Sequence, residues 1–193
     1  PVQDLPIDFC RRHMHLQQVV FSCGIQFIPH GAFDGCRALR EVVIPSTVTS
    51  IGDFAFRLCV SLAEFTFHEG LQILGSDSFV QCALTHVRIP VSLEVIRDGV
   101  FADCESLLNV ELCDGLKVIG ALAFVNCSRL REIWLPLTLE VIGKCAFADC
   151  DSLETANLPK GLKQIGEEAF TNCSSLQSVA IPSTVEKIKK DAF

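Results

Sequence analysis

Apolar residues recur along this chain at a nearly constant interval. Phenylalanine returns every 23 positions, apart from one step of 22, and a cysteine follows it three residues later in seven of the eight units. A repeat of this length is typical of solenoids, in which each unit buries its apolar face against its neighbours. The phenylalanines are Phe33, Phe56, Phe79, Phe101, Phe124, Phe147, Phe170 and Phe193, and the cysteines are Cys36, Cys59, Cys82, Cys104, Cys127, Cys150 and Cys173. The shorter step arises where Ala83 stands alone between Cys82 and Leu84 in place of two residues.

The order of polar and apolar positions within a unit predicts its local structure. The unit reads L-x-x-V-x-I-P-x-x-[LV]-x-x-I-G-x-x-A-F-x-x-C-x-x. Its V-x-I part alternates, which predicts a short strand with Val42 and Ile44 inward and Glu41 and Val43 outward. Proline suits the strand end because it cannot donate to a ladder. The spacing of A-F-x-x-C predicts one turn of α or 3-10 helix. We therefore expect a right-handed solenoid of about eight coils, with short parallel strands and a helical turn on another side.

Two stretches carry the repeat phrase most clearly. They are I-P-S-T-V-T-S-I-G-D-F-A-F-R-L-C at residues 44–59 and L-P-K-G-L-K-Q-I-G-E-E-A-F-T-N-C at residues 158–173. The phrase resembles the signature of the BspA-like class of leucine-rich repeats, and the resemblance extends over residues 16–193. It implies a leucine-rich-repeat-like solenoid, a role in adhesion or protein binding, and a location at the cell surface or outside the cell. This repeat class brings no catalytic residues with it.

Residues 1–15 depart from the pattern. Cys10 stands where a phenylalanine is expected, and His13 stands where a cysteine is expected. We predict that residues 1–15 form a degenerate N-terminal coil or cap and that residues 16–193 form a single solenoid domain, cut from a longer protein.

Charge and motif content exclude several classes of function. The formal net charge is -7, and the 16 Lys and Arg residues are scattered instead of forming the basic stripe that a nucleic-acid-binding protein carries. No apolar run reaches the roughly 18 residues needed to span a bilayer, so we expect no membrane insertion by this segment. Motifs for a catalytic serine, a zinc protease or a phosphate loop are absent, so we expect neither catalysis nor a cofactor.

The cysteine column, meaning the cysteines at one position of successive units, has a structural interpretation. Stacked side chains run parallel instead of converging, which disfavours disulfides, and a line of thiols cannot surround a metal ion. We predict small, buried, reduced side chains whose thiols donate to turn carbonyls. Unpaired thiols also favour the cytosol, in opposition to the surface location that the resemblance implies. The cysteines off the column are Cys10, Cys23, Cys113 and Cys145.

The outward strand positions vary from unit to unit, as the residues of a tailored binding face do. We therefore predict a scaffold that binds a protein partner through this face, with a structural spacer or stalk as the alternative. His86 and Arg88 also have a structural interpretation, because cross-strand charge pairs with Glu64 and Glu111 explain them equally well. The candidate protein-binding residues are Glu41, Val43, Glu64, Thr66, His86, Arg88, Glu111, Glu132 and Trp134.

Two further columns have structural interpretations. In the first of them, the last five residues alternate between negative and positive charge. This alternation predicts an exposed ladder of opposite charges that fixes the register of the coils. The other is mostly glycine, but Pro29, Arg97 and Lys189 interrupt it, so close packing explains it better than a left-handed backbone does. The first column consists of Thr49, Gln72, Glu94, Lys117, Glu140, Lys163 and Glu186, and the glycines are Gly52, Gly75, Gly120, Gly143 and Gly166.

Overall fold

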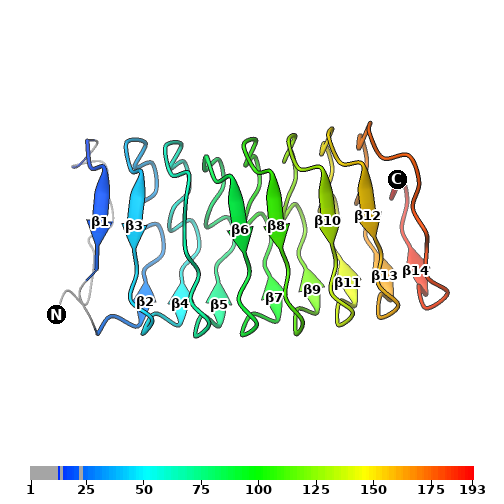
Figure 1. Ribbon diagram of the computed structural model, residues 1–193, viewed down its shortest axis with the longest axis horizontal. Helices are drawn as coiled ribbons and strands as arrows, with labels where there is room; N and C mark the ends of the chain where they lie inside the picture. The colour runs from blue at the N-terminus through cyan, green and yellow to red at the C-terminus, as the bar shows by residue number, and fades with distance from the viewer. Residues whose placement is uncertain (1–12, 14, 22–23) are drawn as a thin grey trace.

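The computed structural model describes residues 13, 15–21 and 24–193, which wind into one row of stacked coils (Figure 1). The strands of the coils form two rows, which we call the first face and the second face. The first face comprises β1 (Gln18–Val20), β3 (Glu41–Val43), β6 (His86–Arg88), β8 (Asn109–Glu111), β10 (Glu132–Trp134) and β12 (Thr155–Asn157). The second face comprises β2 (Phe27–Ile28), β4 (Ser50–Ile51), β5 (Ile73–Leu74), β7 (Val95–Ile96), β9 (Val118–Ile119), β11 (Val141–Ile142), β13 (Gln164–Ile165) and β14 (Lys187–Ile188).

The strand pairing confirms the predicted solenoid. All pairs are parallel, and they join residues 23 positions apart, as in Gln18 with Glu41 and Val118 with Val141. Like residues therefore lie above like residues along the row. The predicted cap at residues 1–15 falls almost entirely outside the described part of the chain and remains a prediction.

The phenylalanine column forms the centre of the core. Its rings stack from Phe33 to Phe193, with successive centroids 5.1 to 5.9 Å apart and ring planes within 25° of parallel. The leucine, isoleucine and cysteine columns surround these rings in one continuous cluster of buried side chains. Burial of this apolar surface is the main stabilising contribution, because no single coil can enclose its own apolar side chains.

The predicted helical turn is wrong, because the described residues contain no helix. In each coil the turn side, by which we mean the A-F-x-x-C segment and the residue before it, instead contains residues with positive φ, such as Leu122 at 59° and Asn126 at 57°. As a result, the N–H groups of Leu122, Phe124 and Asn126 donate to the next coil at 2.8 Å, and the N–H groups of Val125 and Cys127 close local turns. A helix would direct these N–H groups along its own axis and leave the coils unlinked here. The acceptors are the carbonyls of Lys144, Ala146 and Ala148.

Both faces are interrupted beside the coil of residues 62–83, the first face at this coil itself and the second face between it and the next coil. We call this stretch of the row the junction. Residues 62–68 form no strand, and neither β3 with β6 nor β5 with β7 is joined by a ladder. The turn side remains bonded there, as in Phe79 N–H to the Val100 carbonyl at 2.9 Å. Two bulky side chains cause this interruption. Phe65 and Phe67 occupy positions where other coils carry smaller apolar residues, and their rings pack against Phe79 with centroids 4.8 and 5.4 Å away.

Ser78, beside the junction, occupies the alanine position of the A-F pair. It is fully buried, and its Oγ is the one buried side-chain polar atom without a hydrogen-bond partner among the described residues. We expect Ser78→Ala to raise the free energy of unfolding by about 1 kcal/mol, because it removes a desolvated, unsatisfied hydroxyl. Urea denaturation measures this change. The reverse substitution, Ala146→Ser, is the matched control and should destabilise, whereas a less stable Ser78→Ala variant would contradict the assignment.

Candidate functional site

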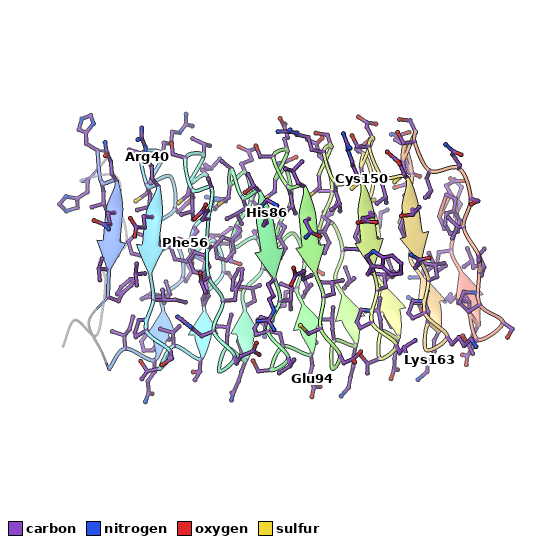
Figure 2. The ribbon with its side chains drawn as sticks, viewed as in Figure 1. Arg40, Phe56, His86, Glu94, Cys150 and Lys163 are labelled. Atoms are coloured by element: carbon purple, nitrogen blue, oxygen red, sulfur yellow. The ribbon has the colours of Figure 1, made fainter. Side chains whose placement is uncertain are left out.

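All nine predicted binding residues lie on the first face with their side chains exposed. Seven of them belong to strands β3, β6, β8 and β10, and His86 marks the middle of the row in Figure 2. Glu64 and Thr66 belong to the coil that has lost its strand at the junction. The arrangement therefore brings the predicted residues onto one surface, but that surface is not one continuous sheet.

An open depression of about 230 Å³ occupies the first face at the junction. It exists because residues 64–67 form no backbone hydrogen bonds to the described coils on either side. Its rim includes four of the predicted residues, whereas the aromatic side chains at its base were not predicted as part of a site. The signal for them was present as F-T-F at residues 65–67, where other units have smaller residues. The lining consists of Phe65, Thr66, Phe67, His86, Val87, Arg88, Asn109 and Glu111.

Arg88 is the cation at the centre of this rim. Its Nη1 lies 3.2 Å from Glu69 Oε1, and its Nε lies 3.7 Å from Glu111 Oε2. The predicted pair with Glu111 is therefore present, whereas His86 contacts the Thr85 hydroxyl at 3.1 Å. Exposed ion pairs contribute only about 0–1 kcal/mol, so Arg88 is free to exchange these contacts for others.

Trp134 is the largest exposed side chain of the first face. Strand pairing places it between Glu111 on β8 and Asn157 on β12, and 64% of its surface is exposed. Leu137, three residues further along the same coil, is 71% exposed. Exposed tryptophans with an apolar neighbour are frequent anchors of protein interfaces, because they bury a large area at little entropic cost.

Six thiols of the cysteine column donate to the preceding coil, which confirms the structural interpretation for these members. Each Sγ lies 3.1 to 3.4 Å from the carbonyl of a column phenylalanine, as in Cys104 to Phe79 at 3.2 Å. Burial raises the pKa of the Cys59 and Cys104 thiols to about 12. The prediction of a fully reduced column is wrong at Cys36, which is disulfide-bonded. Cys10 and Cys23 lie outside the described residues. The six are Cys59, Cys82, Cys104, Cys127, Cys150 and Cys173.

Among the cysteines that the structure describes, we expect iodoacetamide to alkylate Cys113 first in the native protein. Cys113 is partly exposed, whereas Cys145 donates its thiol to Glu168 at 3.2 Å and has its pKa raised by burial and by that carboxylate. The six column thiols should react only after unfolding. Peptide mass spectrometry with and without urea measures the order, and rapid native labelling of Cys104 would contradict it.

The same burial makes stability depend on pH. The pKa of the Cys59 thiol rises from 9.0 to about 12 in the folded state, so folding favours the neutral thiol. This contribution is fully present below pH 9 and is lost as the pH rises toward the folded-state pKa.

The predicted ladder of alternating charges lies along one exposed edge, marked in Figure 2 by Glu94 and Lys163. Lys117 Nζ lies 2.8 Å from Glu94 Oε2, and Lys163 Nζ lies 2.6 Å from Glu140 Oε2. The neighbouring carboxylate raises the pKa of Lys117, and Lys163 lowers the pKa of Glu140. Opposite charges therefore pair at two of the four steps of the predicted ladder, Glu94 with Lys117 and Glu140 with Lys163.

Neither a metal centre nor a membrane span emerges from the described part of the chain. Its His, Cys, Asp and Glu side chains form no group of three or more that could hold an ion. Residues 13, 15–21 and 24–193 also contain no helix of the length and apolarity that crossing a bilayer requires.

Comparison with known proteins gives matches over most of the chain. The family model of the BspA type leucine rich repeat region matches residues 26–150 and 94–193. Among solved structures, a leucine rich cell surface protein from Faecalibacterium prausnitzii is 25% identical with a TM-score of 0.58, covering 91% of this chain and 56% of its own. The T. pallidum leucine rich repeat protein is 28% identical with a TM-score of 0.58, covering 89% and 72%. This chain thus spans little more than half of the F. prausnitzii protein. A search of curated proteins finds no match.

Proposed function

This chain belongs to the BspA-type leucine-rich repeat family, and from that premise we propose that it binds a protein partner through the first face, as an adhesion scaffold does, without catalysing a reaction. The observation that carries the proposal is the contrast between inward and outward positions. Inward positions repeat from coil to coil and form the core, whereas the outward positions of the first face change in charge, size and polarity along the row. Packing within the solenoid therefore does not determine which residues stand at these outward positions.

The centre of the proposed interface lies between the junction and Trp134. Arg88, Glu111 and Trp134 occupy the same outward position of adjacent strands β6, β8 and β10. Tryptophan and arginine are the side chains most often found at the energetic centre of an interface. A stable interface covers about 800 Å² on each partner, so it would extend from these residues to further coils of the first face.

A triple variant tests this proposal. We expect Arg88→Ala, Glu111→Ala and Trp134→Ala together to weaken capture of protein partners by at least about tenfold, because one anchor side chain alone contributes about 2 kcal/mol. The measurement is quantitative mass spectrometry of proteins retained by the immobilised chain, followed by titration of each retained protein.

The matched control changes Glu105, Leu122 and Arg129 to alanine outside the first face, where all three are exposed. Its retained proteins should equal those of the unmodified chain. Equal capture by the first-face variant would overturn the proposal and favour a spacer. In a spacer, adding or removing whole coils should matter and surface residues should not.

A further inference from the structure

The second face carries an apolar stripe that the core does not use. Ile73, Val95, Val118 and Val141 occupy the outward position of β5, β7, β9 and β11, directly before the inward residue of each strand. Ile73 and Val95 are 42% and 41% exposed, and the two valines that follow are half-buried. Val95, Val118 and Val141 lie on the continuous sheet of β7, β9 and β11, and Ile73 lies across the junction on β5. Apolar side chains that follow one another in this way mark an interaction surface, because isolated exposed residues are the usual case.

The charged ladder runs beside this stripe and shares three coils with it, those of Val95, Val118 and Val141. Glu94, Lys117, Glu140 and Lys163 each directly precede the outward strand residue of their coil. They are between 42% and 65% exposed, so a second molecule can reach all four. Over these four coils the signs are negative, positive, negative, positive, and the four charges sum to zero. Glu186 adds a fifth charge at one end, where an antiparallel copy centred between Lys117 and Glu140 places the uncharged Gln72 opposite it.

When this order of charges is reversed and laid against itself, a positive charge stands opposite every negative charge. If a second copy lies antiparallel, its ladder presents positive, negative, positive, negative, and every carboxylate faces an ammonium group. If the second copy lies parallel and in register, every charge faces its like. The pattern therefore selects one orientation, as a two-fold interface requires, because each surface must be complementary to itself.

We propose that the second face is a two-fold interface between two antiparallel copies of this chain. The axis passes between Lys117 and Glu140, so Lys117 meets Glu140 of the second copy, and Glu94 meets Lys163 of the second copy. Val118 and Val141 then pack at the centre, where an interface is most apolar, and the charges form its rim. Each ladder charge keeps its neighbour within the chain and gains a second partner.

The overall charge supports the choice of this surface. The chain carries a net charge of -7, so two copies repel one another unless the surfaces that meet are balanced. The first face is unbalanced, since Glu41, Glu64, Glu111 and Glu132 outnumber Arg88 there. The proposed dimer leaves the first face open and does not depend on the protein partner proposed for it.

Charge-swapped ladders test the dimer by analytical ultracentrifugation. We expect the unmodified chain to dimerise. An all-acidic ladder, with Lys117→Glu and Lys163→Glu, should raise the dimer dissociation constant by about 100-fold, because like charges then face one another. An all-basic ladder, with Glu94→Lys and Glu140→Lys, should behave in the same way. An equimolar mixture of these two variants should form a heterodimer of about the original affinity.

The quadruple variant, with Glu94→Lys, Lys117→Glu, Glu140→Lys and Lys163→Glu, separates the dimer from folding. It restores, with reversed signs, the two ion pairs within the chain at positions 94 and 117 and at positions 140 and 163. Its four charges also remain complementary to their reverse, so it should dimerise like the unmodified chain. Circular dichroism shows which variants are folded. A monomeric unmodified chain, a monomeric quadruple variant or a dimeric all-acidic variant would each overturn the proposal.

Discussion

Replacing Phe124 with alanine is expected to lower the free energy of unfolding by about 3–5 kcal/mol. Its ring is fully buried, with centroids 5.3 Å from both Phe101 and Phe147. The loss includes the apolar transfer free energy and the cost of the cavity left behind. The cavity cannot close, because the Phe124 N–H bonds the Ala146 carbonyl at 2.8 Å and the other coils hold their spacing through similar bonds.

Urea denaturation followed by circular dichroism measures this loss. Leu137→Ala is the control, since it removes a side chain of comparable apolar character that is 71% exposed. We expect its effect to stay within about 0.5 kcal/mol of zero. A similar small effect for Phe124→Ala would mean that the phenylalanine column does not form the core.

The second large effect is expected at Gly143. A Cβ atom built there would lie 2.5 Å from the carbonyl carbon of Gly120 and 2.6 Å from the Ala121 nitrogen. These are backbone atoms of the preceding coil, which cannot rotate away as a side-chain end would. We therefore expect Gly143→Ala to destabilise the protein by about 3 kcal/mol, at the upper end of the usual cost of overpacking.

Arg97→Ala is the control within the same column. Arg97 already carries a Cβ atom, and it lies at the junction, where β5 and β7 are not joined by a ladder. Thermal unfolding should show a large fall in Tm for Gly143→Ala and almost none for Arg97→Ala. Equal and small changes in both variants would show that the coils approach less closely than the structure indicates. Gly143 has no positive φ, which agrees with the predicted role of the glycine column in close packing.

The stacking and the outward columns could be predicted from the sequence because a fixed interval of 23 residues carries every position into the same place in the next coil. The turn side could not be predicted from apolar spacing, since A-F-x-x-C suits both a helical turn and a turn with positive φ. Asn126, Asp149 and Asn172 held the missing signal, because asparagine and aspartate tolerate positive φ better than most residues.

The junction escaped prediction for a related reason. Phe65 and Phe67 satisfy the apolar pattern of inward positions, and the pattern does not measure side-chain volume. Ala83 indicated a shortened turn but not the loss of the ladders on both faces. The disulfide at Cys36 could not be predicted either, because the repeat makes this cysteine equivalent to six others that are free.

Nuclear Overhauser effects in the isotopically labelled protein test the stacking most directly. Stacked coils predict backbone contacts between residues 23 positions apart, such as Val118 with Val141 and Ile119 with Ile142, which pair in parallel strands. The same contacts should recur from coil to coil along β7, β9, β11 and β13. Antiparallel contacts between neighbouring segments, with none at the 23-residue interval, would contradict the solenoid and with it both proposed interaction faces.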